Sequence, residues 1–194
     1  MNESLEPPRR CLELMNPFDT VLLVIDVQER LVPAMTGAAR LVWNVRRLIE
    51  AAGTLDVPVI ATEQYPQGLG ETVMELKPLL ETRASKVRFS GAECRELLDP
   101  FDRGERAKML LCGIESHVCV LQTALDLMAE GWRVYIAADA VASRDPFDRD
   151  IALRRLESAG ATLCTTEMVL FEWCETASRA EFKAISNLAK EIGP

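Results

Sequence analysis

The segment Lys108–Leu127, with the sequence KMLLCGIESHVCVLQTALDL, most constrains the fold of this chain. It begins with the apolar run Met109–Cys112, which is typical of a buried strand. Cys119, Thr123 and Leu127 then recur at helical spacing. The segment therefore predicts a strand, a short turn and a helix, which is the repeating unit of a parallel α/β sheet.

The same alternation of patterns continues along the chain. Strands are expected at Thr20–Val27, Val57–Thr62, Lys108–Gly113, Trp132–Ala138 and Ala161–Thr165. Helices are expected at Gly37–Ala52, Glu71–Leu80, Ala92–Leu98, Cys119–Ala129, Pro146–Ala159, 166–174 and 178–190. Glu63–Gly70 is expected to be a loop, and residues 85–90 to cross the edge of the sheet or loop over it. We expect an N-terminal arm at residues 1–19, and over 20–194 a single α/β domain, a doubly wound parallel sheet with helices on both faces.

Charge and composition exclude several classes of protein. The net charge is −8 and the 22 Lys and Arg residues are scattered, so a basic footprint for nucleic acid is missing. The N-terminus lacks the apolar region of a secretory signal, and no run approaches the roughly 20 apolar residues of a membrane span. The six cysteines are dispersed without metal spacing, which favours a reducing cytoplasm over a disulfide framework.

Cys119 is expected in the first turn of a helix that begins where a parallel strand ends. The free N–H groups and the dipole of such a helix lower the pKa of a thiol. Ligands of open α/β sheets bind at the carboxyl ends of the strands. Cys119 is therefore a candidate nucleophile, although a free cysteine at this position is also compatible with a small buried hydrophobe.

Asp26 and Lys86 also stand out. Asp26 ends the run VLLVI, where its carboxylate is expected to be partly buried and to need a partner, unless it caps the next turn. Lys86 is flanked by small and apolar residues rather than by a charged helical face, although an ordinary solvated lysine also fits. With Cys119, these residues supply a base, a cation and a thiol, which together can activate a nucleophile.

His117 is the only histidine of the chain. It lies two residues before Cys119 at a helix start, so the two side chains point about 200° apart around the axis. A Cys–His pair is therefore disfavoured, and His117 is expected to line a pocket or to serve in a turn. One histidine leaves no His-rich metal cluster, and no glycine-rich phosphate loop is present, so no metal and no cofactor is expected.

Four segments carry a resemblance to a known family. They are VLLVIDVQERLVP, SKVRFS, LLCGIESHVCVLQTALDLMAEGWRVYIAADAVASR and RRLESAGATLCTTEMVLFE, and the likeness runs from about residue 20 to 190. The chain resembles the isochorismatase-like cysteine hydrolases. Within that superfamily it is most similar to the isochorismatase-domain-containing proteins, and the EQYPQGLG loop adds to this resemblance. The resemblance implies a sheet of six parallel strands and a catalytic triad of Asp26, Lys86 and Cys119.

The resemblance also implies a non-proline cis peptide between Ile114 and Glu115, and an oxyanion hole made by the backbone N–H groups of Glu115 and Cys119. Two departures limit what it implies about the substrate. Nicotinamidases of the superfamily bind a metal through histidines that this chain lacks. True isochorismatases have no cysteine at the position of Cys119, which argues against vinyl-ether hydrolysis.

These observations predict a metal-independent cysteine hydrolase of a small amide or related acyl compound, cytoplasmic and homo-oligomeric. Asp26 would take the thiol proton, Cys119 would attack the carbonyl carbon, and Lys86 would pair with Asp26. Contacts to the substrate are expected from Gln28, Gln64, Tyr65 and Phe89. Two alternatives remain at this point: an interaction protein whose site is catalytically silent, and a thiol that senses oxidants.

Overall fold

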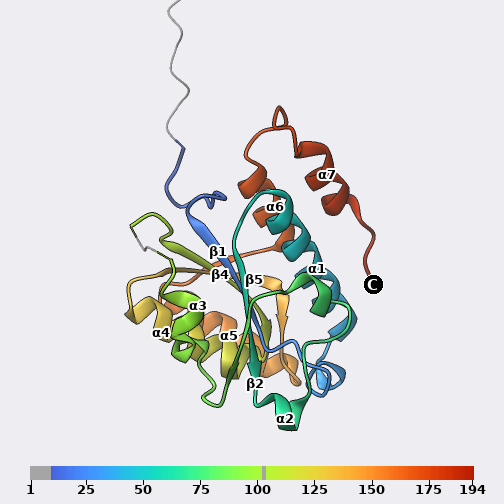
Figure 1. Cartoon of the computed structure of the whole chain (residues 1–194), viewed down its shortest axis with the longest axis vertical. Helices are drawn as coiled ribbons and strands as arrows, with labels where there is room; N and C mark the ends of the chain where they lie inside the picture. The colour runs from blue at the N-terminus through green and yellow to red at the C-terminus, as the bar shows by residue number, and fades with distance from the viewer. Residues whose placement is uncertain (1–9, 102–103) are drawn as a thin grey trace, which may run out of the picture.

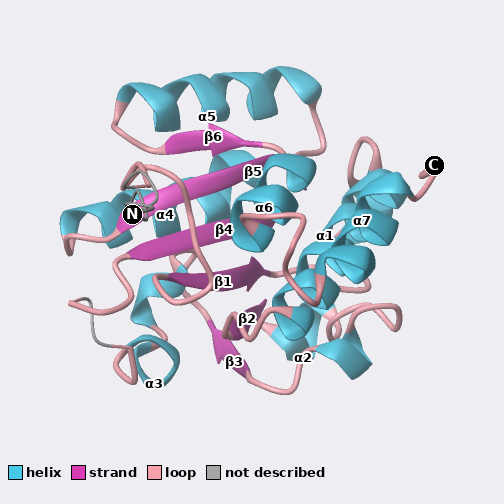
Figure 2. Cartoon of the chain, turned by 90° about the horizontal axis from the view of Figure 1, so that it is seen from above, coloured by secondary structure: helices cyan, strands magenta, loops and turns pink. Residues whose placement is uncertain are grey.

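Six parallel strands form one sheet in the order β3-β2-β1-β4-β5-β6 in the computed structural model, which describes residues 10–101 and 104–194. Figure 2 shows this order across the sheet, from β6 to β3. The strands are β1 (Thr20–Ile25), β2 (Val59–Gln64), β3 (Arg83–Lys86), β4 (Lys108–Ile114), β5 (Arg133–Ala142) and β6 (Thr162–Cys164). The doubly wound parallel sheet predicted from the sequence is confirmed.

Helices cover both faces of the sheet, with α1, α6 and α7 on one side and α3, α4 and α5 on the other (Figure 1). The helices are α1 (Ala38–Thr54), α2 (Pro66–Leu69), α3 (Arg95–Leu98), α4 (Leu121–Ala129), α5 (Pro146–Ser158), α6 (Thr166–Cys174) and α7 (Phe182–Lys190). None of the helices in the described residues is long and apolar enough to cross a membrane.

The alternation of side chains along each strand divides the core into two layers. On β1, Leu22 and Val24 pack with α1, α6 and α7, whereas Leu23 and Ile25 pack with α3, α4 and α5. Both faces are buried, so β1 is apolar throughout instead of alternating between apolar and polar residues.

The strand order reverses between β1 and β4, and this reversal places the candidate residues. β1 leads outward to β2 and β3, whereas β4 leads outward to β5 and β6. A crevice forms at the carboxyl ends of the strands where the order reverses, and ligands of open α/β sheets bind there. Asp26 directly follows β1, and Cys119 lies in the helical segment that directly follows β4.

Three local predictions need correction. Residues 83–86 form the edge strand β3, where the sequence indicated an edge crossing or a loop from residue 85. Glu71–Leu80 is not a regular helix, because Thr72 forms an isolated antiparallel bridge with Gln28 and only Lys77–Leu79 forms a 3-10 turn. The expected loop Glu63–Gly70 contains the end of β2 and the short helix α2.

Residues 10–19 run along the amino edge of the sheet. The Tyr135 hydroxyl donates to the carbonyl of Glu13 at 2.7 Å, and the Lys108 ammonium donates to the carbonyl of Leu14 at 2.7 Å. Met15 is fully buried against the core. The predicted arm therefore packs onto the domain over these residues, whereas residues 1–9 lie outside the described part of the chain.

Candidate active site

A buried ion pair lies at the carboxyl edge of the sheet. The Lys86 ammonium is 2.7 Å from Oδ2 of Asp26, and both side chains are 0% exposed. Asp26 adopts a φ of 51°, a left-handed conformation that Asp tolerates better than most residues. The chain therefore turns immediately after β1, and the carboxylate stays at the end of the strand.

The residues of β2 hold both members of this pair. The Thr62 hydroxyl donates to Oδ1 of Asp26 at 2.7 Å, and Oε1 of Gln64 accepts from the Lys86 ammonium at 2.6 Å. The same ammonium also reaches the carbonyl oxygens of Phe89 at 3.0 Å and Arg88 at 3.3 Å. Lys86 is therefore a buried cation whose three protons have acceptors within the protein.

Cys119 lies in one π-helical turn, Ser116–Val120, that runs directly into α4. Its side chain is nearly enclosed, at 6% exposure, and Thr123 and Leu127 on the same helical face are fully buried. The Asp26 carboxylate and the Lys86 ammonium lie close enough to Cys119 for both charges to change the pKa of its thiol. The structure thus brings together the three residues of the predicted triad.

The protonation state of Cys119 differs from the sequence-based expectation. Burial, together with the nearby Asp26 carboxylate, raises the pKa of the Cys119 thiol to about 12, and Lys86 opposes this rise. The helix start was expected to lower this pKa, but desolvation of the sulfur and the adjacent carboxylate outweigh it. The resting thiol is therefore neutral at pH 7 and needs a base when it attacks.

The turn between β4 and Cys119 carries the predicted cis peptide, which lies between Ile114 and Glu115. The Glu115 carboxylate accepts from the backbone N–H of Arg144 at 3.1 Å and from its guanidinium at 3.0 Å. These contacts tie the turn to the end of β5. The N–H groups of Glu115 and Cys119 flank this turn, and their role as oxyanion donors remains a prediction.

His117 faces away from the ion pair, toward the loop after β5. Its Nδ1 is 2.9 Å from the Ser143 hydroxyl, and its Nε2 is 3.7 Å from the Asp148 carboxylate. His117 therefore packs between the turn after β4 and the residues that follow β5, and it does not pair with Cys119. Within residues 10–101 and 104–194, no three His, Cys, Asp or Glu side chains are grouped so that they could hold a metal ion.

The four predicted substrate contacts occupy different environments. The Gln28 amide donates to the carbonyls of Gln64 and Gly70 and accepts from the Gln64 N–H, so it holds the loop after β2 and both of its N–H donors are occupied. Gln64 is bound to Lys86, as described above. Tyr65 and Phe89 are 53% and 52% exposed, and they remain candidates for substrate contact.

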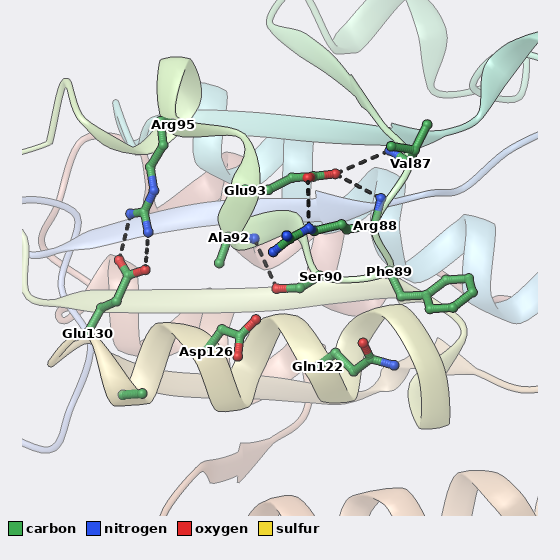
Figure 3. Close-up of a pocket in the computed structure, with 11 residues that line it drawn as sticks. Val87, Arg88, Phe89, Ser90, Ala92, Glu93, Arg95, Gln122, Asp126 and Glu130 are labelled. Carbon is green, nitrogen blue, oxygen red and sulfur yellow. Dashed lines mark hydrogen bonds and ion pairs between the residues drawn. The ribbon is translucent and has the colours of Figure 1, made fainter.

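A groove of about 750 Å³ lies between α4 and the stretch from Val87 to Arg95. Figure 3 shows Phe89 and Gln122 at one end of this groove and the Arg95–Glu130 ion pair at the other. Gln122 is one helical turn beyond Cys119. The groove therefore runs along α4 toward the candidate nucleophile, which is not itself among its lining residues.

The sequence analysis missed one residue in direct contact with the ion pair, Thr62. A signal was present, because Thr62 and Gln64 are polar residues two apart at the end of an apolar strand and therefore share a face of the sheet. Cys94 is a second buried thiol, and it lies close enough to Asp26 and Lys86 for both charges to affect its pKa. Burial is the main cause that raises this pKa to about 11.

Comparisons with known proteins find similar sequences and similar folds. The isochorismatase domain model matches residues 20–168. The mouse protein named isochorismatase domain-containing protein 2A is 38% identical over 187 residues, which cover 96% of this chain and 90% of that protein. A Caenorhabditis elegans structure described as the MAR1 ribonuclease is 38% identical and superposes with a TM-score of 0.86, covering 93% of this chain and 94% of that one.

A more distant structure shows the fold alone. The ycaC gene product of Escherichia coli, described as an octameric hydrolase of unknown specificity, is 22% identical and has a TM-score of 0.84, with coverage of 93% of this chain and 91% of that one.

Proposed function

Because the chain belongs to the isochorismatase domain family, we propose that it is a metal-independent cysteine hydrolase of a small amide or related acyl compound. Family membership supports a hydrolase. The observation that carries the finer proposal is the ion pair of Asp26 and Lys86, which is fully buried and close enough to Cys119 for both charges to affect its thiol.

Acylation begins with the neutral thiol. The Asp26 carboxylate takes the proton of Cys119 as the sulfur forms a bond to the carbonyl carbon of the substrate. The tetrahedral intermediate then collapses. Its C–N bond breaks, Asp26 returns the proton to the leaving nitrogen, and an amine or ammonia departs from the thioester. We propose that the backbone N–H groups of Glu115 and Cys119 bind the oxyanion of this intermediate. Each such donor typically stabilises the transition state by about 3–4 kcal/mol, which would be a large share of the rate enhancement.

In deacylation the sulfur of Cys119 is the leaving group and a water molecule is the nucleophile. Asp26 takes a proton from a water molecule whose oxygen attacks the thioester carbon. The S–C bond breaks, the sulfur of Cys119 regains the proton, and the carboxylic acid product leaves. The two steps together consume one water for each amide bond and require no cofactor.

Lys86 acts in this mechanism as a fixed positive charge rather than as a proton donor. Its ammonium has three protons, and Asp26, Gln64 and the carbonyl of Phe89 accept them at 2.6–3.0 Å. Transfer of a proton to the substrate would break one of these buried contacts. Its charge lies 2.7 Å from Oδ2 of Asp26 and orients the carboxylate that accepts the thiol proton.

The groove along α4 offers room for the non-reacting part of the substrate. It brings together the apolar side chains of Val87 and Phe89 with the polar side chains of Gln122 and Asp126 (Figure 3). Recessed sites with this mixture of groups are typical of small-molecule binding. A small organic substrate with polar groups is compatible with this lining.

Ribonuclease activity has weaker support in this chain. The name ribonuclease belongs to the nematode structure. The net charge of −8 opposes the binding of a polyanion, and the groove is lined by three acidic residues, Glu93, Asp126 and Glu130, against two basic ones, Arg88 and Arg95. A thiol that senses oxidants is also disfavoured, because Cys119 is nearly enclosed and its pKa is raised.

A cytoplasmic location and self-association are parts of the same proposal. The described cysteines are all free, which fits a reducing compartment. Light scattering of the purified protein measures its oligomeric state, and fractionation of cells measures its location.

The deciding experiment is a hydrolysis assay on a panel of primary amides of small carboxylic acids, with released ammonia as the readout. The parent protein and the Cys119→Ala variant are compared, each with and without a chelator, and a structured RNA is added as a separate substrate. We expect ammonia only from the parent, and we expect the chelator to have no effect.

Loss of activity with the chelator, restored by a divalent metal, would overturn the metal-independent mechanism. Amide hydrolysis that survives in Cys119→Ala would remove the nucleophile from the proposal. RNA cleavage by the parent that is absent in Cys119→Ala, without amide hydrolysis, would replace the proposed substrate class.

A further inference from the structure

Strand β2 lies between the two strands that carry the ion pair. In the parallel register, Thr62 pairs with Ile25, the residue before Asp26, and Gln64 pairs directly with Lys86. Thr62 and Gln64 are two residues apart, so their side chains project to the same face of the sheet. Each is therefore beside one charged member of the pair.

Thr62 binds the oxygen of the carboxylate that Lys86 leaves free. Its hydroxyl donates to Oδ1 of Asp26 at 2.7 Å, whereas Lys86 donates to Oδ2, also at 2.7 Å. Thr62 is 1% exposed, so no water competes for its hydroxyl from bulk solvent. With both oxygens held, the carboxylate has one orientation relative to Cys119.

Gln64 binds the ammonium in the same manner. Its Oε1 accepts from Nζ of Lys86 at 2.6 Å, and its Nε2 donates to the carbonyl of Val87 at 2.8 Å. The second contact anchors the amide, so that its oxygen rather than its nitrogen faces the cation. Gln64 therefore connects Lys86 to the backbone of the loop that follows β3.

We propose that Thr62 and Gln64 are positioning residues that together hold the Asp26–Lys86 pair in its charged, oriented form beside Cys119. This inference rests on the proposed function, because it assigns the pair to catalysis. Strand β2 then orients the base, Asp26, through Thr62 and the cation, Lys86, through Gln64. Neither side chain needs to touch the substrate.

The inference predicts a specific change in the pH dependence of activity. The Thr62 hydroxyl donates more strongly to a charged carboxylate than to a neutral carboxylic acid, so its removal favours the neutral form. Hydrogen bonds to charged groups are strong enough to change such an equilibrium by roughly tenfold to a hundredfold. The acidic limb of kcat/KM therefore moves to higher pH by about one to two units when the hydroxyl is removed.

The test uses the full chain with p-nitrophenyl acetate as the acyl probe, and kcat and KM are measured from pH 5 to 9. Thr62→Val removes the hydroxyl at nearly constant volume, and Thr62→Ser keeps it. Gln64→Met removes the acceptor for Lys86, and Gln64→Glu keeps an acceptor oxygen. We expect the valine and methionine variants to lose kcat with little change in KM, and serine to restore the parental pH profile.

A control on the same strand separates positioning from folding. The Glu63 side chain lies between these two residues but projects to the opposite face, where it accepts from the Thr72 hydroxyl at 2.7 Å and lies 3.6 Å from Arg83. Glu63→Gln therefore perturbs the stability of β2 without touching the pair. We expect its acidic limb to match that of the parent, whatever its melting temperature.

The outcomes distinguish this inference from the function on which it rests. If Cys119→Ala still turns over the probe through an acyl-enzyme, the proposed function fails. If Cys119→Ala is inactive but Thr62→Val keeps the parental pH profile and kcat, the function stands and the positioning role of Thr62 is overturned. A profile that moves equally in Thr62→Ser and Thr62→Val also overturns it, because the hydroxyl would then be irrelevant.

Discussion

Replacing Lys86 with methionine tests the buried ion pair through stability rather than through activity. Methionine preserves most of the length and apolar character of the lysine side chain but removes its charge. The Asp26 carboxylate then stays 0% exposed, with the Thr62 hydroxyl as its remaining partner among the contacts described above. Leaving a buried charge without its partner costs about 3–5 kcal/mol.

That loss is large relative to the stability of a typical domain, which is about 5–15 kcal/mol. Urea unfolding followed by circular dichroism measures it directly. With a slope of about 1–3 kcal/mol per M of urea, the midpoint of Lys86→Met falls by about 2 M relative to the parent at pH 7. The slope itself should stay unchanged, because the same surface is exposed on unfolding.

Lys77→Met is the matched control, since it makes the same side-chain change at the exposed ion pair with Glu71. Both of those charges remain hydrated when the pair is broken, so little stability is lost. Adding Asp26→Asn to Lys86→Met should recover much of the deficit by removing the uncompensated charge. If Lys86→Met loses no more stability than Lys77→Met, the pair is not the buried, desolvated unit described here.

Three further perturbations have defined outcomes. Asp26→Asn removes the proposed base, so turnover should fall by about 10²–10⁴-fold; turnover at the parental rate would contradict the assignment of the base. Gly113→Ala places a Cβ 2.0 Å from a backbone oxygen of β1 at a φ of +115°, so thermal unfolding should reveal a loss above about 1–3 kcal/mol. Gly131→Ala, where the space is open, should lose less. Gln28→Leu removes three hydrogen bonds between the Gln28 side chain and the backbone of Gln64 and Gly70, and should cost about 1–3 kcal/mol of stability. A changed KM at unchanged stability would instead support substrate contact by Gln28.

The sequence predicted the position of the site better than its chemistry. The strand–turn–helix pattern around Cys119 was sufficient to place this residue near the carboxyl end of a strand, because a βα unit has few alternative arrangements. The same reasoning placed Asp26 at the end of β1. The pKa of Cys119 was expected to be lowered, and it is raised instead. The position at a helix start is visible in a sequence, whereas the burial of the sulfur and its distance from Asp26 depend on the packing of separate elements.

The short edge strand β3 and the role of Gln28 were not predictable for related reasons. Arg83–Lys86 has the sequence RASK, which lacks an apolar or alternating pattern, and it forms a strand because β2 offers it a backbone ladder. Gln28 contacts the backbone of Gln64 and Gly70, which are 36 and 42 residues away in sequence. Contacts of this kind are set by tertiary structure rather than by local pattern.

The most direct test of the account is the covalent state of Cys119 during turnover. The protein is mixed with p-nitrophenyl acetate, quenched in acid within the first turnover, and mapped by peptide mass spectrometry. The account predicts a single acetyl group on Cys119, absent in Cys119→Ala, much reduced in Asp26→Asn, and retained in Cys94→Ala. Release of p-nitrophenol at the parental rate by Cys119→Ala, or an acetyl group on another residue with Cys119 unmodified, would contradict it.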